Sequence, residues 1–193
     1  MKSNPKLHLC RTNRHVNHDY SKKGVYYITL NTQNSVPYLG EILNNEMILS
    51  ENGEIVKNEL LKIPGYHKRV ILDEWIIMPN HLHFIIKLED YDFDNGISNI
   101  DTNVGSIHVG SIHESNLHTK PKSYSTIRRN MLIPKIMGKF QMKTSKQINI
   151  QRNTPGQKNW QNDYYDVIIY DKYEYDRIKQ YIKDNTKNWK PKK

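Results

Sequence analysis

Two histidines stand one residue apart in an apolar stretch, His81 and His83 in MPNHLHFIIKL (78–88). Because side chains of a β-strand alternate between its faces, both imidazoles would project from one face while Leu82 points into the core. Two imidazoles on one face of a rigid strand can occupy adjacent positions around one metal ion. Separately hydrogen-bonded histidines on a polar sheet face are the common alternative, and the motif by itself favours that alternative.

The last helical stretch, DKYEYDRIKQYIKDN (171–185), adds two candidates for the same chemistry. Tyr181 and Asn185 are four residues apart, so they lie one above the other on a helix. They border an apolar stripe of Tyr175, Ile178 and Ile182 that would pack the helix onto the domain. Tyr181 could reach a site from there, and Asn185 could add a carbonyl oxygen to a two-histidine metal site. In a chain with 13 tyrosines, plain packing is the simpler explanation for Tyr181.

Seven elements are needed to position these residues, in the order β-α-β-β-α-β-α. They are a strand at 24–33, a helix within 47–65 that stops at Pro64-Gly65, two strands within 69–88, a helix at 131–148, a strand at 163–170 and a helix at 171–185. Ser50 and Asp171 are the expected N-caps. Without the last helix, the order matches an α+β, ferredoxin-like split βαβ fold with a four-stranded antiparallel sheet and two helices on one face.

The ends and one internal segment do not fit this pattern. We expect a flexible basic arm at 1–22, a single domain at 23–189 and a basic tail at 190–193. Residues 89–123 would interrupt the domain, because they contain the tandem pentapeptide GSIHV-GSIHE and a degenerate third unit. Its three histidines could bind a metal, but a period of five suits neither a helix face nor a strand face. A low-complexity disordered insertion is therefore the preferred interpretation.

The charge of the 193-residue chain indicates an anionic partner. Its 29 Lys and Arg against 20 Asp and Glu give a net charge of +9, which favours nucleic acid first and an anionic membrane surface second. A single cysteine, Cys10, excludes an intrachain disulfide and fits a reducing compartment. No apolar run approaches the roughly 20 residues of a membrane span. We therefore expect a cytoplasmic protein that does not bind membranes.

Lysines mark one face of the expected helix at 131–148. Lys135, Lys139 and Lys143 recur at i, i+4 and i+8, apart from an apolar stripe that begins at Ile133. A basic ridge of this kind could follow a phosphate backbone. A merely solvated helix face explains the same pattern equally well.

Taken together, these motifs resemble the REP-associated tyrosine transposases, which are single-tyrosine HUH transposases (histidine, hydrophobic residue, histidine). The matching stretches are DYSKKGVYYITLNTQ, GEILNNEMILSENGEIV, MPNHLHFII, IMGKF, TPGQKNWQNDYYDVIIYD and YDRIKQYIKDNTKNW. They follow the family's order over nearly the whole chain outside 1–22 and 89–123. The family usually has Asn-Pro where this chain has Asn185-Thr186, so here the last helix could continue past Asn185.

The resemblance implies a reaction and a role for each candidate residue. Tyr181 would be the nucleophile, and His81, His83 and Asn185 would bind Mg²⁺ or Mn²⁺ at the scissile phosphate. The enzyme would nick and rejoin single-stranded DNA, in particular hairpin-forming repeats, through a covalent 5′-phosphotyrosine. It would act as a monomer or a homodimer. The lysine ridge would hold the DNA backbone.

Two other functions remain open from the sequence. One is a non-catalytic, domesticated relative that binds DNA hairpins without cutting them. The other is a ferredoxin-like RNA-binding protein, which would need exposed aromatic side chains on its central strands to stack on bases. The histidines at that position make the RNA-binding alternative the weaker one.

Overall fold

The computed structural model describes residues 18–90 and 124–190. Most of the expected arm at 1–22, the pentapeptide repeat with its histidines, and Cys10 lie outside these described residues, as does the basic tail beyond Lys190. None of the helices in the described part is long and apolar enough to cross a membrane.

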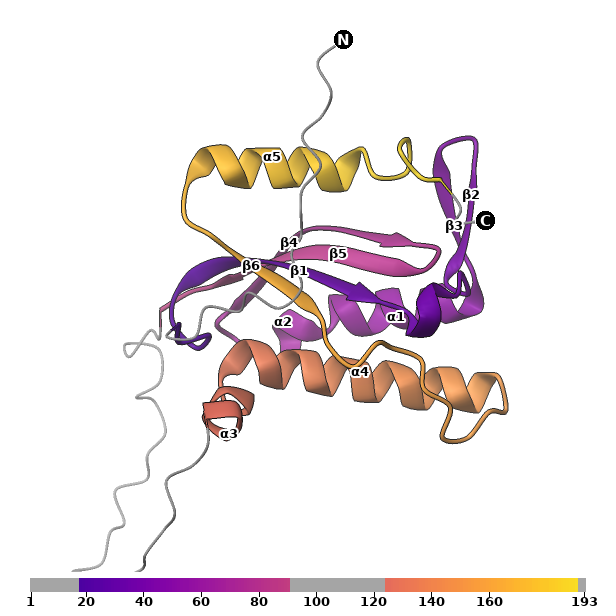
Figure 1. The fold of residues 1–193 in the computed structure, drawn as a ribbon, viewed down its shortest axis with the longest axis horizontal. Coiled ribbons are helices and arrows are strands. Elements are labelled where there is room, and N and C mark those ends of the chain that lie inside the picture. Colours follow the sequence, from indigo (N-terminus) through magenta and orange to yellow (C-terminus); the bar gives the residue numbers. More distant parts are fainter. Residues whose placement is uncertain (1–17, 91–123, 191–193) are drawn as a thin grey trace, which may run out of the picture.

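A four-stranded antiparallel sheet forms the centre of the domain (Figure 1). Its strands are β1 (Gly24–Asn31), β4 (Val70–Met78), β5 (His81–Leu88) and β6 (Tyr165–Ile169). They lie in the order β4-β5-β1-β6, and each neighbouring pair is antiparallel. This is the strand order of the split βαβ arrangement, so the ferredoxin-like fold class predicted from the sequence is confirmed.

Helices cover both faces of this sheet. On one face lie α1 (Glu51–Leu61), the short α2 (Ile63–Tyr66) and the long α4 (Leu132–Gln151), which is preceded by α3 (Tyr124–Arg129). On the opposite face lies a single helix, α5 (Lys172–Lys183), as Figure 1 shows. The domain therefore has three layers, and the face below α5 is the one that the two histidines share.

The alternation of side chains along β5 assigns its residues to two separate cores. Leu82, Phe84 and Ile86 belong to the large core between the sheet and helices α1 and α4. Ile85 belongs to a small core below α5, which consists of Tyr27, Ile85, Ile169, Ile178 and Ile182. His81 and His83 alternate in step with Ile85, so they lie on the face below α5. The spacing had predicted that they share one face, opposite Leu82.

Helix α4 matches its sequence pattern closely. Pro134 lies in its first turn, where its missing N–H costs nothing, and Ile133, Ile136, Met137 and Phe140 are buried. Trp160, in the loop before β6, packs into the same core and donates Nε1–H to Thr144 Oγ1 at 2.9 Å. Trp160 is therefore a packing residue and presents no ring to a ligand.

Both predicted N-caps are confirmed. Ser50 Oγ accepts a hydrogen bond from the Gly53 N–H, and Asp171 Oδ1 accepts one from the Glu174 N–H at 2.8 Å. The predicted end of the last helix is wrong, because α5 ends at Lys183 and Asn185 lies in the turn that follows. The N–H of Asn185 donates a hydrogen bond to Ile182 O at 3.3 Å. This bond spans three residues instead of the four of an α-helix, as is common where a helix ends.

Three short elements between 40 and 66 were not predicted. β2 (Gly40–Leu43) and β3 (Glu46–Leu49) form a separate hairpin, joined by Asn44 and Asn45 at positive φ. Asparagine tolerates this conformation, and a two-residue turn with two positive φ values suits a hairpin.

Pro64-Gly65, expected to stop a helix, instead lies within α2, where Pro64 occupies the first turn. A short 3₁₀ turn, η1 (Gln33–Ser35), follows β1.

The expected boundary of the arm at residue 22 is also wrong. Tyr20 is only 1% exposed, and its carbonyl accepts a hydrogen bond from the Ile133 N–H. Ser21 Oγ accepts another from the Leu132 N–H at 2.9 Å. These two contacts satisfy N–H groups in the first turn of α4 that have no partner within the helix. Residues 18–22 therefore belong to the folded domain.

Candidate functional site

His81 and His83 form the centre of the candidate site on the sheet face below α5. Their ring centroids lie 4.7 Å apart, with the ring planes inclined by 70°. His83 is 3% exposed, whereas His81, at the start of β5, is half-buried. Thus His83 lies in the interior between the sheet and α5, and His81 is partly accessible to solvent.

Two hydroxyl groups on the neighbouring strand hold the ring of His83. Its Nδ1 lies 2.7 Å from Tyr27 Oη and 2.8 Å from Thr29 Oγ1. Thr29 is the direct cross-strand partner of His83, and Tyr27 is the next residue of β1 on the same face. The sequence analysis missed both residues, because strand pairing between β1 and β5 brings them to the histidine. The alternation along GVYYITLN was the available signal.

The environment keeps His83 neutral. Burial, followed by the neighbouring charge of His81, lowers the pKa of His83 well below its ordinary value. Its Nε2 is buried and has no hydrogen-bond partner among the described residues. When Nδ1–H donates to one of the two hydroxyls, Nε2 carries the lone pair. A neutral imidazole with this lone pair is the form that binds a metal ion.

His81, like His83, has a polar partner on Nδ1, and this partner is its sequence neighbour Asn80. Its Nδ1 lies 2.7 Å from Asn80 Oδ1, and an amide oxygen can only accept a hydrogen bond. In the neutral form of His81, the proton is therefore on Nδ1 and the lone pair is on Nε2. Both histidines thus have a polar partner on Nδ1 that orients the ring, as metal-binding histidines do.

Helix α5 and the turn after it supply two aromatic rings to the histidines. The ring of Tyr181 contacts that of His83, with centroids 5.4 Å apart, and its side chain remains 39% exposed. Trp189, which the sequence analysis did not select, lies with its ring centroid 5.8 Å from that of His81. The structure therefore brings Tyr181 to the histidine pair within one chain, with an exposed fraction that leaves it accessible to a ligand.

Asn185 lies in the chain between these two rings. It is 8% exposed, and its Nδ2 is buried without a hydrogen-bond partner among the described residues. Its backbone is held by the turn, where its carbonyl accepts a hydrogen bond from the Asn188 N–H. The Nδ2 atom of this amide group thus takes part in no hydrogen bond among the described residues.

The donor atoms suit a divalent metal ion with open coordination positions. The described residues contain no cluster of three or more His, Cys, Asp or Glu side chains that could hold a metal. Two imidazole nitrogens form a smaller set, and Asn185 in the turn after α5 is the candidate for an added amide oxygen, a combination that suits ions with mixed nitrogen and oxygen ligands. A bound ion would also give the buried Nε2 of His83 the partner that it lacks.

The predicted lysine ridge lies on the other face of the sheet. Lys135, Lys139 and Lys143 belong to α4, one layer away from the histidines (Figure 1). Lys139 and Lys143 place their Nζ atoms 4.5 and 3.9 Å from the ring centroid of Tyr66, and Lys143 also lies 3.9 Å from Glu59 Oε2. The structure therefore does not bring the ridge to the candidate site.

Comparisons with known proteins show the fold. The chain is 29% identical over 188 residues to an uncharacterized protein of Haemophilus influenzae, covering 97% of this chain and 94% of that protein. A solved REP-associated tyrosine transposase bound to a REP hairpin aligns with a TM-score of 0.50 at 15% identity, over 93% of this chain and 73% of the other. A candidate transposase of Deinococcus radiodurans aligns with a TM-score of 0.45 at 13% identity, over 91% of this chain and 97% of the other. No protein-family model matches the sequence.

Proposed function

We propose that this protein nicks and rejoins single-stranded DNA in a metal-dependent reaction through a covalent 5′-phosphotyrosine. Tyr181 is the nucleophile, and His81, His83 and Asn185 bind the metal ion. The observation that carries the proposal is the contact between the accessible Tyr181 and the buried His83, whose Nε2 has no hydrogen-bond partner among the described residues. A nucleophile beside an imidazole nitrogen that can bind a metal ion is the arrangement that this chemistry needs.

The tyrosine reaction is a transesterification at phosphorus. Tyr181 Oη forms a bond to the phosphorus atom, and the bond from phosphorus to the 3′ oxygen breaks. The proton of the tyrosine hydroxyl is transferred overall to the released 3′-OH, and the 5′ phosphate stays on the protein. Because one phosphodiester replaces another, attack by a 3′-OH can reverse the step without an external energy source.

A bound Mg²⁺ or Mn²⁺ would neutralise the charge that develops on a non-bridging phosphate oxygen. His81 and His83 would hold it through Nε2, and Asn185 through Oδ1. Imidazole ligands suit Mn²⁺ better than Mg²⁺, so we expect stronger activity with Mn²⁺.

The DNA partner is inferred from charge and from the fold neighbour. A net charge of +9 favours a polyanion, and the solved transposase of the same fold is bound to a hairpin. We propose hairpin-forming single-stranded repeats as the substrate, with an unpaired base stacked on Trp189 near His81. Lys135, Lys139 and Lys143 would hold a part of the DNA that passes around to the α4 layer.

The RNA-binding alternative is disfavoured by the position of α5. Base stacking on a ferredoxin-like sheet needs an open sheet face with exposed aromatic residues. Here α5 covers that face, and Tyr27 on central strand β1 is buried below it. The alternative of hairpin binding without catalysis would use the same DNA-binding surface as the proposed enzyme. The two functions differ only in whether the DNA is cut.

The experiment that separates these functions is cleavage of labelled single-stranded DNA taken from the flanks of the gene. With Mn²⁺ we expect nicked product and a denaturant-resistant protein–DNA adduct, and with EDTA we expect neither. Tight hairpin binding without cleavage under any metal condition would favour the non-catalytic hairpin-binding function. Cleavage that persists in EDTA would contradict the role of the metal ion.

The hydroxyl of Tyr27 should tune metal binding without contacting the ion. Tyr27→Phe keeps the ring, which is stacked on His83, but removes one of the two groups that hold Nδ1. We expect Mn²⁺ affinity to fall about tenfold, as is usual when the partner of a ligating histidine is lost. Mn²⁺ titration followed by electron paramagnetic resonance measures this without activity. Tyr26→Phe is the matched control, because it removes a hydroxyl from the opposite face of the same strand. Equal losses in both variants would contradict the prediction.

Because Tyr181 meets the histidines of its own chain, catalysis should be possible in cis in either a monomer or a homodimer. An equal mixture of Tyr181→Phe and His81→Ala proteins is therefore expected to remain inactive, since every chain lacks one half of its site. Adduct formation in the mixture, compared with each protein alone, is the measurement. Recovery of a substantial fraction of wild-type adduct would show that the tyrosine of one chain serves the histidines of another.

A further inference from the structure

Helix α5 is attached to the sheet by a limited apolar contact. Only Ile178 and Ile182 are buried in this helix, and with Tyr27, Ile85 and Ile169 of the sheet they form a core of five buried residues. A two-residue link, Tyr170-Asp171, connects the helix to β6. Apolar packing is non-directional, so this small core alone does not determine the rotation and sliding of α5 over the sheet.

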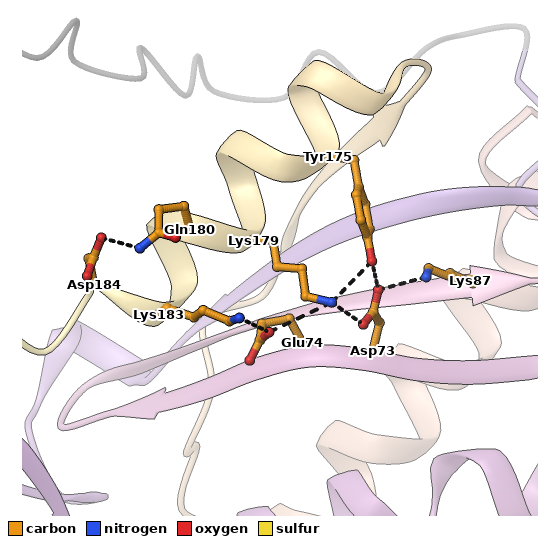
Figure 2. Close-up of polar contacts among 8 residues, drawn as sticks. All are labelled: Asp73, Glu74, Lys87, Tyr175, Lys179, Gln180, Lys183 and Asp184. Carbon is orange, nitrogen blue, oxygen red and sulfur yellow. Dashed lines mark hydrogen bonds and ion pairs between the residues drawn. The ribbon is translucent and has the colours of Figure 1, made fainter.

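A polar stripe along α5 provides the directional contacts. Tyr175, Lys179 and Lys183 recur every four residues and therefore lie on one flank of the helix. Figure 2 shows this flank facing Asp73 and Glu74 of β4. Tyr175 Oη donates a hydrogen bond to Asp73 Oδ2, and Lys179 Nζ lies 2.9 Å from Asp73 Oδ1.

The second acidic residue extends the contact toward the end of the helix. Glu74 Oε2 lies 3.5 Å from Lys183 Nζ and 3.9 Å from Lys179 Nζ. On the sheet side, Lys87 of β5 lies 2.9 Å from Asp73 Oδ2. Tyr181 stands midway in sequence between Lys179 and Lys183, so the part of α5 that carries it is held on both sides.

A β-bulge explains how two consecutive residues can reach the same helix. In a regular strand, Asp73 and Glu74 would point to opposite faces. The β4–β5 register shifts between Leu72 and Trp75, which pair with Ile86 and Phe84, so two residues of β4 oppose one residue of β5. The bulge lets both carboxylates face α5, as Figure 2 shows.

Burial makes these contacts stronger than exposed ion pairs. The side chains of Asp73 and Glu74 are 15% and 25% exposed. Burial raises the pKa of Asp73, but hydrogen bonds from Lys87, Tyr175 and Lys179 outweigh it and lower the pKa to about 2. Asp73 is therefore ionised throughout the physiological range and holds two cations and one hydroxyl at once.

We infer that Asp73 and Glu74, here called the acidic clamp, are positioning residues that set the placement of α5 over the sheet and thereby hold Tyr181 against His83. The effect on catalysis rests on the proposed function, whereas the placement of the helix does not. The experiment therefore measures helix placement and cleavage separately.

Helix placement is measured by double electron–electron resonance in the full chain. Spin labels are attached at the exposed positions Tyr173→Cys on α5 and Leu61→Cys on α1, in a Cys10→Ser background. We expect one narrow distance peak for the parent and loss of that single peak in Asp73→Asn and in the milder Glu74→Gln. The control is Glu54→Gln, which breaks an exposed ion pair with Lys57 in the opposite layer. A narrow peak retained in both clamp variants, with unchanged mean, would overturn the inference.

Cleavage by the same unlabelled clamp variants tests the link to Tyr181. A misplaced nucleophile lowers kcat while DNA binding is unaffected, and displacement of about 1 Å can cost on the order of 100-fold. We expect kcat to fall about 10- to 100-fold at unchanged KM, with Glu54→Gln like wild type.

The double variant Glu74→Lys with Lys183→Glu re-forms an ion pair and should recover part of kcat relative to either single variant. A helix that loses its fixed placement while kcat stays at the wild-type value would overturn the positioning role. Absence of cleavage in the wild type would refute the proposed function and leave the resonance result as the test of the clamp.

Discussion

Replacement of Tyr181 by phenylalanine is expected to abolish the protein–DNA adduct and to lower cleavage by on the order of 10³-fold or more. The hydroxyl is the only group removed, and the ring that contacts His83 is retained. The side chain is 39% exposed, so the substitution leaves no buried hydroxyl partner behind in the core. Hairpin binding should remain within about twofold of wild type. The hydroxyl acts in the bond-forming step, and the contacts that bind the DNA before the reaction are retained.

The measurement is adduct formation on labelled single-stranded DNA, with mass spectrometry to identify the modified peptide. Tyr173→Phe is the matched control, since Tyr173 lies on the same helix and is 81% exposed. An adduct mapped to Tyr175 in wild-type protein would contradict the assignment of Tyr181. Tyr175 is the next tyrosine to consider, but its hydroxyl is bound to Asp73.

Replacement of His81 by alanine is expected to weaken Mn²⁺ binding about 100-fold or more. Loss of a metal ligand has a larger effect than loss of a residue that only hydrogen-bonds to a ligand. His81 is half-buried, so its removal disturbs packing less than removal of the 3% exposed His83. Cleavage should fall in parallel, and raised Mn²⁺ concentrations should restore part of it.

Metal affinity is measured on the DNA-free protein by Mn²⁺ titration, which is independent of catalysis. His67→Ala is the matched control, because His67 lies after α2 in the layer on the other side of the sheet. Comparable losses in His67→Ala and His81→Ala would mean that the measured Mn²⁺ is bound elsewhere. Unchanged affinity in His81→Ala would remove the histidine pair from the metal site.

Local pattern was sufficient for the main elements of the fold. The turn residues Met78-Pro79-Asn80 divided the apolar stretch at 69–88 into two strands, and the apolar stripe that begins at Ile133 identified α4. The caps at Ser50 and Asp171 depend on contacts within three residues, so the sequence predicts them directly. The β2–β3 hairpin was missed because its strands have only four residues each, too few to show a clear period.

The residues around the candidate site also fall into two groups: those that local geometry predicted and those that required tertiary contacts. The shared face of His81 and His83 follows from strand geometry, and the stacking of Asn185 above Tyr181 was expected from helix geometry, although α5 ends before Asn185. Tyr27 and Thr29 required the register of β1 against β5, and Trp189 required the path of the chain after α5. The separation of the α4 lysines from the histidines required knowledge of which sheet face each helix covers.

The sequence by itself determined which residue types were available for chemistry and which side of each strand or helix they share, because those properties repeat with the local period of the backbone. Only the tertiary structure decided which faces meet. Strand pairing placed two hydroxyls on His83, and the bulge at Asp73-Glu74 turned two neighbouring carboxylates toward one helix. Contacts of this kind join residues up to about a hundred positions apart, such as Asp73 with Tyr175 and Lys179, so no local period records them.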